Sequence, residues 1–239
     1  MPQRFLVDRG GLVVYLGLTL AACRGAPGML VPAAATPISR DQVGQWVAAT
    51  VPAEHRLHKF KWLFQDERSS AGGRGSARIA PPDSLRFDAA GPFGSGAGAA
   101  AVVGDTPLWA EPADALKKLV PNYPLMWAMF GVARLPSAAD SLRGLAQGSV
   151  IAWQYAGAAD TIDYVRTTGK TGKLVAEVRH AGSVVGRAET TLDSSGAPLT
   201  ARLVVPGAPA KLNLTFLSTA RADFAPETWT APKPTARQP

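Results

Sequence analysis

Cys23 is the only cysteine in the 239-residue chain, and its surroundings define what its thiol can do. Arg4 and Arg9 make the start of the chain basic, residues 11–20 are apolar, and small residues precede the cysteine. This order of regions is typical of an export signal. The apolar stretch is too short to span a bilayer, which takes about 20 apolar residues. Cys23 is therefore either a processing site or a free thiol behind a short membrane stub, and we favour processing.

The four residues Leu20–Cys23 resemble the lipobox of bacterial lipoproteins. The resemblance implies cleavage before Cys23, acylation of Cys23 with palmitate-type chains, and anchoring by lipid, to which each buried methylene contributes about 0.8 kcal/mol. Among such lipoproteins an Asp after the cysteine usually signals retention at the inner membrane. Arg24 stands there instead, which resembles the outer-membrane default. Residues 1–22 are thus predicted to be a signal peptide, and residues 23–36, rich in Ala, Pro and Gly, a flexible tether.

Residues suited to catalysis or metal binding are few. His55 and His58 are three positions apart, but no Cys, second His pair or carboxylate pair completes a metal site, and His180 is alone. The run Gly169–Thr171 matches the end of a phosphate loop, yet Tyr164 replaces its first glycine and the pattern around it is strand-turn-strand. No Gly-x-Ser-x-Gly elbow occurs. We predict no enzyme activity, no cofactor and no metal.

The composition is that of a globular protein, with 46% hydrophobic and 18% charged residues and a net charge of +7. The part after residue 22 is long enough for one good core. A basic balance favours anionic surfaces, but the basic residues are spread along the chain, as on an ordinary solvated surface. Because export removes the protein from nucleic acid, we predict no nucleic-acid partner.

Hydrophobic periodicity predicts the elements that must position these residues. A helix capped by Ser39 carries Val43, Trp46 and Val47 on one face and stops at Pro52. Strands with alternating hydrophobic residues are predicted to begin at residue 57 and to span residues 74–80, 84–90, 97–104 and 106–110. Six more are predicted to begin near residues 149, 160, 173, 184, 198 and 211. Between them, residues 111–148 are predicted to be helical, including the apolar run 125–132 and a segment capped by Ser137.

The order of elements, the lipobox, the strand Phe60-Lys61-Trp62 and the turn Gly91-Pro92-Phe93-Gly94 together resemble the family of LolA and LolB. The resemblance spans most of the chain after residue 22. It implies an α+β, mainly β, domain over residues 37–225: an N-terminal helix, then an incomplete antiparallel β-barrel of about eleven strands with a helical lid or plug. Residues 226–239 form a Pro-rich tail. In that family the barrel holds the acyl chains of other lipoproteins.

Large side chains on the predicted strands are placed to cover an apolar face, either as a cavity wall or as solid core. They are Trp62, Phe64, Leu85, Phe87, Trp109, Trp153 and Tyr155. The insert adds Leu125, Met126, Trp127, Met129 and Phe130, whose methionines suit a surface that accepts varied alkyl shapes. Flanking prolines favour a movable lid, and an apolar helix buried as a plug is the alternative. We predict that the strand side chains named above line a ligand cavity together with Leu125, Met126, Met129 and Phe130.

Phe93 lies in a Gly-rich turn that cannot bury it locally. LolB carries a leucine at the tip of a projecting loop that inserts into the membrane, and by this resemblance Phe93 is predicted to insert; the alternative is that it folds back under the barrel rim. In LolA a strand arginine binds the lid, and Arg78 and Arg86 are the candidates here.

The predicted function is that of a lipoprotein anchored in the outer membrane and facing the periplasm. It would bind lipid acyl chains or lipidated proteins and help deliver them to the membrane, with a periplasmic carrier protein as a further partner. The alternative is a structural or interaction lipoprotein of the envelope whose sheet is solid.

Overall fold

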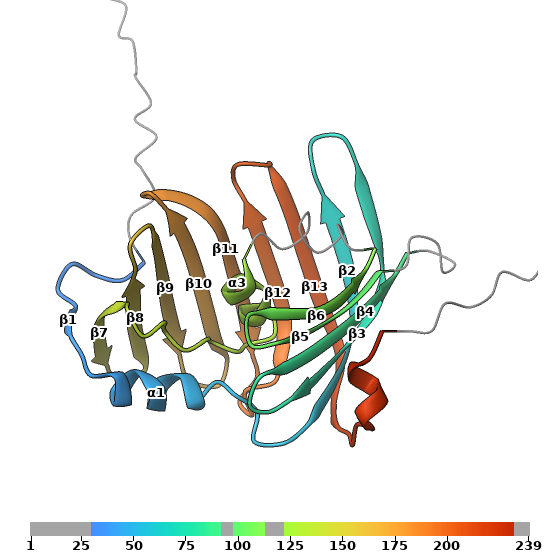
Figure 1. Ribbon diagram of the computed structural model, residues 1–239, viewed down its shortest axis with the longest axis horizontal. Coiled ribbons are helices and arrows are strands. Elements are labelled where there is room, and N and C mark those ends of the chain that lie inside the picture. Colours follow the sequence, from blue (N-terminus) through green and yellow to red (C-terminus); the bar gives the residue numbers. More distant parts are fainter. Residues whose placement is uncertain (1–29, 92–97, 113–121, 232–239) are drawn as a thin grey trace, which may run out of the picture.

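The computed structural model describes residues 30–91, 98–112 and 122–231. Within them the chain forms one sheet of thirteen antiparallel strands, two short α-helices and a 3₁₀ helix (Figure 1). Across the sheet the strands follow the order β1-β7-β8-β9-β10-β11-β12-β13-β2-β3-β4-β5-β6. Most neighbours in space are also neighbours in sequence, with β1–β7 and β13–β2 as the two exceptions. The sheet is open, with β1 and β6 at its edges.

The strands have the following bounds: β1 Thr36–Pro37, β2 Arg56–Gln65, β3 Ser70–Ala80, β4 Ser84–Ala90, β5 Gly98–Val103, β6 Thr106–Glu111, β7 Ser141–Gln147, β8 Val150–Ala156, β9 Asp160–Thr167, β10 Gly172–His180, β11 Ser183–Leu192, β12 Pro198–Val205 and β13 Ala210–Arg221. The helices are α1 Arg40–Ala48, α3 Tyr123–Ala128 and the 3₁₀ helix η2 Pro226–Trp229. No helix in the described ranges has the length and apolar character needed to cross a bilayer.

The prediction of a mainly β domain with an N-terminal helix is confirmed, but the helix predicted after Ser137 is wrong. That stretch forms β7, which pairs with both β1 and β8. Gly144 lies opposite Trp153 and leaves room for α1, because a Cβ there would come within 2.5 Å of Ile38 and 2.7 Å of the Trp46 ring. Pairing with the sheet therefore outweighs the helix-favouring composition. With β1 and β7 the strands exceed the predicted eleven.

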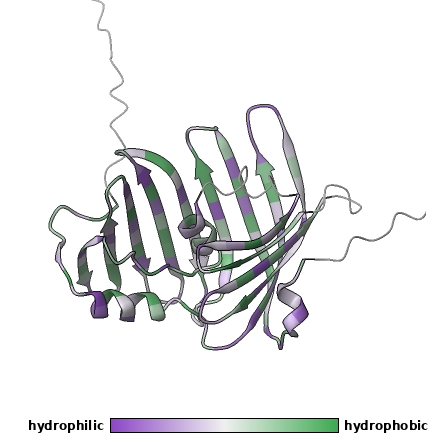
Figure 2. Cartoon of the chain, viewed as in Figure 1, coloured by the Kyte–Doolittle hydropathy of each residue, from purple (hydrophilic) through white to green (hydrophobic). Residues whose placement is uncertain are grey.

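Successive side chains of a strand point to opposite sides, so the sheet has two faces. Figure 2 shows hydrophilic and hydrophobic residues following one another along several strands. The face that carries α1 and α3, here called the inner face, holds the main buried core. Large members of this core come from strands far apart in the sheet, namely Leu85, Trp153, Tyr164, Leu174 and Leu203. The opposite, outer face carries most of the charged residues of the strands. This division explains why an alternating sequence pattern locates the core side of each strand.

Helix α1 closes the β7–β8 side of the inner face. Ser39 Oγ accepts a hydrogen bond from Gln42 N at 3.2 Å, which satisfies a backbone donor of the first turn. Val43 and Val47 are buried, and the Trp46 ring lies 5.9 Å from that of Trp153. The remaining side of the helix faces solvent, as its amphipathic sequence predicts.

Residues 30–35 cross the outer face. Val31 and Ala35 are buried against Ala152, so this part of the predicted tether lies on the sheet. Beneath it Asp163 is buried and accepts a hydrogen bond from Gln154 Nε2 at 2.7 Å. Burial raises the pKa of this carboxyl, partly offset by Gln154 and by backbone hydrogen bonds from residues 30 and 31. Residues 30–35 therefore pack as part of the folded domain.

Candidate functional site

Helix α3 lies directly on the inner face of the sheet. Its residues Pro124–Ala128 are all buried, and Met129, which follows, is 2% exposed. Leu125 approaches β11 so closely that a Cβ on Gly186 would come within 2.6 Å of its side chain. Glycine at this position therefore lets the helix sit on the strand.

Two hydrogen bonds attach α3 to distant parts of the sheet. Trp127 Nε1 donates to Gly104 O at 2.9 Å, in the turn between β5 and β6. Thr190 Oγ1, on β11, donates to Ala128 O at 2.7 Å. Because β11 and β5 are separated by five strands in the sheet order, the sheet must curve to bring both to one short helix (Figure 1). The helix occupies the concave side of that curve.

The chain just after α3 is held more firmly still. The Arg134 guanidinium lies 5.0 Å from the Trp127 ring, and its Nε lies 3.3 Å from Asp105 Oδ1. The main chain of Arg134 donates to Tyr164 Oη at 3.2 Å and accepts from Tyr155 Oη at 2.9 Å. Burial raises the pKa of both tyrosines, so their hydroxyls stay protonated. The downstream end of α3 is thus fixed by polar contacts.

At the upstream end of α3, the described residues make no comparable side-chain hydrogen bonds or ion pairs. Asn122 occupies the N-cap position without a side-chain hydrogen bond, and its Oδ1 is buried without a partner. Tyr123 is only half-buried. The helix is therefore hydrogen-bonded at its middle and downstream end, and held upstream by apolar packing.

The inner face continues beyond α3 at the end formed by Trp62, Phe64 and Leu212, here called the Trp62 end. All three side chains are half-buried, and Phe64 pairs with Leu212 across β2 and β13. Trp62 Nε1 donates to Ala90 O at 3.2 Å, beside the start of the β4–β5 connection. Figure 1 shows the β2–β3 and β12–β13 hairpins extending past α3 at this end. Apolar surface on the concave side is therefore partly open to solvent.

Most of the predicted cavity residues lie together. One buried cluster contains Leu85, Leu125, Met126, Met129, Phe130, Trp153 and Tyr155, and Trp62 and Phe87 pack against it. Phe64 follows Trp62 on the same face. Trp109 is elsewhere: it lies on the outer face, where its Nε1 donates to Trp229 O at 2.8 Å. Phe93 and Cys23 fall outside the described residues.

The suggestion that Arg78 or Arg86 binds the helix is wrong. Both lie on the outer face and pair with Asp88. Arg86 also lies over the Trp109 ring at 5.1 Å and donates to Thr228 O at 2.8 Å. Arg86 therefore holds the start of the C-terminal tail against β4 and β6.

The two histidines that are three positions apart point to different surroundings. His55 stacks on Phe224 with ring centroids 5.4 Å apart. His58 is buried on the inner face, where its Nδ1 lies 2.9 Å from Thr219 Oγ1. Burial, aided by the nearby positive charge of Arg56, lowers the pKa of His58 to about 4. No group of three or more His, Cys, Asp or Glu side chains in the described ranges is placed to bind a metal.

A cavity of about 460 Å³, not anticipated from the sequence, lies at the opposite end of the inner face from Trp62. It is lined by the chain after α1, the β11–β12 turn, His58, Phe130 and Arg166. The sequence did carry a signal for it, because Ile162, Tyr164 and Arg166 alternate in phase and place a cation on the apolar face.

No protein-family model and no curated protein matches the sequence. Among solved structures, a LolA superfamily protein from Nitrosomonas europaea is similar with 8% identity and a TM-score of 0.48, over 81% of this chain and 98% of that one. A domain from Vibrio parahaemolyticus, named for outer membrane lipoprotein sorting, is similar with 7% identity and a TM-score of 0.48, over 77% and 93%. MucB of Pseudomonas aeruginosa, in its complex with MucA, is similar with 14% identity and a TM-score of 0.35, over 81% and 60%. The solved structures to which this chain is similar thus include LolA-superfamily and lipoprotein-sorting proteins, as the sequence resemblance predicted.

Proposed function

We propose that this protein is a lipid-anchored envelope protein that binds acyl chains, free or on lipidated proteins, on its inner face and helps deliver them to the outer membrane. The observation that carries the proposal is the position of α3. An apolar helix of six residues covers the concave face, and among the described residues its hydrogen bonds to the sheet lie at its middle and downstream end. Displacing it would uncover Leu85, Leu174 and Leu203 as a binding surface.

The chemistry of the helix suits exchange with alkyl chains. Met126 and Met129 are unbranched and adaptable, and apolar side chains surround the helix where an acyl chain would replace it. In the closed state α3 occupies the space that the ligand would take. In the open state it would form one wall of an incomplete barrel. An empty protein would thereby keep its apolar face out of water.

The Trp62 end is the proposed exit toward the membrane. The connection that carries Phe93 begins next to Ala90, whose carbonyl accepts the Trp62 indole hydrogen bond. Its other end, Gly98, pairs with Ala89 on the neighbouring strand. An apolar tip emerging here would enter a bilayer close to the open part of the apolar face. We propose Cys23 as the lipidated residue that keeps the domain at that bilayer.

The test is to loosen α3 and measure ligand uptake. Thr190→Val keeps the side-chain shape but removes the hydrogen bond to Ala128 O, which contributes about 1 kcal/mol. Since the closed state competes with ligand, the variant should bind an apolar fluorescent acyl probe about fivefold more tightly than wild type. Thr191→Val, one residue along β11 on the outer face, is the matched control and should bind as wild type does.

The rival function is that of a structural or interaction lipoprotein in which α3 is permanent core. It predicts that Thr190→Val lowers the free energy of unfolding without changing probe affinity. It also predicts no fatty chain in mass spectra of the purified protein. Both results together would reject the carrier proposal.

A further inference from the structure

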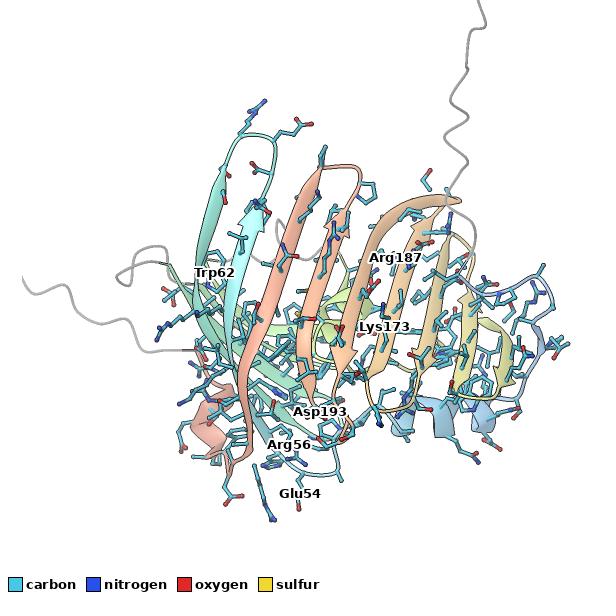
Figure 3. All side chains as sticks on the ribbon, turned by 180° about the vertical axis from the view of Figure 1, so that it is seen from behind. Glu54, Arg56, Trp62, Lys173, Arg187 and Asp193 are labelled. Carbon is cyan, nitrogen blue, oxygen red and sulfur yellow. The ribbon has the colours of Figure 1, made fainter. Side chains whose placement is uncertain are left out.

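The cavity opposite the Trp62 end differs chemically from the face beneath α3. Its floor is apolar, and the side chains that form it come from five separate segments: Val51, Ile79, Phe130, Leu192 and Phe216. Its rim is polar and includes Arg56, Arg166 and Asp193. Figure 3 shows Arg56 and Asp193 at one end of the sheet and Trp62 toward the other. An apolar floor with charge at the rim is the shape of a site for an amphiphile.

Arg166 is the informative residue. It extends from β9 on the inner face, between Ile151 of β8 and Leu174 of β10, and is half-buried. No side chain or carbonyl in the described part of the chain forms a hydrogen bond or ion pair with it. Burial lowers the pKa of its guanidinium, with no carboxylate acting in the opposite direction. A partly desolvated cation without a partner among the described residues leaves its hydrogen-bond donors available to an anion.

The other charged groups at the cavity do not neutralise Arg166. Asp193 Oδ1 accepts three hydrogen bonds within its own turn, from Ser195 N at 2.8 Å, Ser195 Oγ at 2.7 Å and Ala197 N at 3.0 Å. His58 is uncharged at neutral pH because its pKa is about 4. With Arg56 and Arg166 positive and Asp193 negative, the lining carries one net positive charge.

We propose that this cavity is a second binding site, which takes an amphiphile with one anionic headgroup and a single acyl chain. Arg166 and Arg56 would hold the carboxylate or phosphate, and the chain would lie against Phe130, Phe216 and Ile79. The volume of about 460 Å³ sets the size. At about 30 Å³ for each water-sized group it accommodates roughly 15 heavy atoms, which is one chain of moderate length. The proposal does not rest on the carrier function.

The test is calorimetric titration of the full chain with four probes: dodecanoate, dodecyl phosphate, the neutral dodecanol and inorganic phosphate. Wild type should bind the two anionic amphiphiles, and the tighter of them identifies the headgroup source as carboxylate or phosphate. Arg166→Gln should weaken both at least tenfold, because a charged hydrogen bond contributes about 1.5–3 kcal/mol. Arg202→Gln, on an exposed outer-face position of β12, is the matched control and should leave binding unchanged.

Folding does not obscure this test, because Arg166→Gln removes an unpartnered, partly buried charge and should not lower the free energy of unfolding. A second variant, Ala53→Trp, places a large ring at an exposed residue of the cavity lining and should block both amphiphiles. Because only this cavity is expected to select by charge, the ratio of dodecanoate affinity to dodecanol affinity tests this proposal, whereas a gain in affinity for both probes in Thr190→Val, which loosens α3, tests the carrier proposal; failure of one is therefore distinguishable from failure of the other. Equal affinity for dodecanol and dodecanoate, equal affinity for inorganic and dodecyl phosphate, or wild-type binding by Arg166→Gln would each overturn the proposal.

Discussion

Helices α1 and α3 cover the inner face in different ways. Helix α1 is amphipathic: Ser39 caps it, Val43 and Val47 face the core, and its other side faces water. Helix α3 has no side-chain cap, and Pro124–Ala128 are buried on every side. Water therefore completes the surroundings of α1, whereas α3 is stable only where apolar groups surround it. We therefore expect α3, and not α1, to exchange with an apolar ligand.

The largest expected effect comes from truncating the centre of α3. Trp127→Ala should lower the free energy of unfolding by about 3–5 kcal/mol, because it removes a buried indole and its hydrogen bond to Gly104 O. Added tetradecanol should restore part of the loss by filling the space, measured by urea unfolding with and without the alcohol. The matched variant in α1, Val43→Ala, should cost about 1.5–3 kcal/mol and regain nothing. Equal recovery in both variants would contradict the distinction between the helices.

A smaller effect is expected from acid, at the downstream end of the α3 segment. His58 lies 6.4 Å from Phe130 between ring centroids, and its pKa is lowered to about 4 from an unfolded value of 6.5. Between pH 6.5 and pH 4, His58 is protonated in the unfolded chain and neutral in the folded one. The free energy of unfolding therefore falls as the pH falls through this range. From pH 7 to 4.5 this group should account for a loss of about 2–3 kcal/mol.

Chemical unfolding at the two pH values measures this loss. His58→Phe provides the comparison, since the rings of Phe130 and Phe216 already lie beside this position and that of Phe60 packs against both. The variant should lack this part of the pH dependence. If wild type and variant lose equal stability on acidification, His58 does not titrate as its burial predicts.

The smallest effect on stability is expected at Phe93, where Phe93→Glu should change the free energy of unfolding by no more than about 0.5 kcal/mol. Transfer of a bound acyl probe to phospholipid vesicles should nevertheless slow several-fold, because a charged tip is costly to insert. Leu135→Glu, at a residue 62% exposed beyond α3, is the control and should transfer at the wild-type rate. Undiminished transfer by Phe93→Glu would place the membrane contact elsewhere.

Alternation of side chains predicted most strands and their core faces. The predicted strand 84–90 coincides with β4. Trp62 and Phe64 lie on the apolar face as predicted, and His58 and Phe60 share this face of β2 with them. Where alternation is short or interrupted, the prediction failed. Strand β6 has six residues and a register shift opposite Ala101 and Val102, and Trp109 consequently lies on the outer face. Across such a bulge, alternation in the sequence does not tell which face of the sheet a side chain occupies.

The candidate sites depended on tertiary partners that local patterns do not encode. The helix-favouring composition after Ser137 gave no sign that Gly144 meets Trp46 of α1. Arg166 was in phase with Ile162 and Tyr164, but its lack of a carboxylate partner could be recognised only once all neighbouring strands were in place. Sequence therefore located the apolar insert, and the fold was needed to find the cavity at Arg166.

The packing of residues 30–35 on the sheet also limits how far the domain could travel. If Cys23 is held in a membrane, only seven positions separate it from Leu30, and an extended chain of that length reaches at most about 25 Å. Residues 30 and 31 contact the sheet at Asp163, in the first half of β9. The first residues of β9 pair with the last residues of β10. They lie at the same end of the sheet as Trp62. So short a linker would keep the Trp62 end against the bilayer and the Arg166 cavity facing the aqueous side. The length of this linker alone would then set the orientation of the domain relative to the membrane.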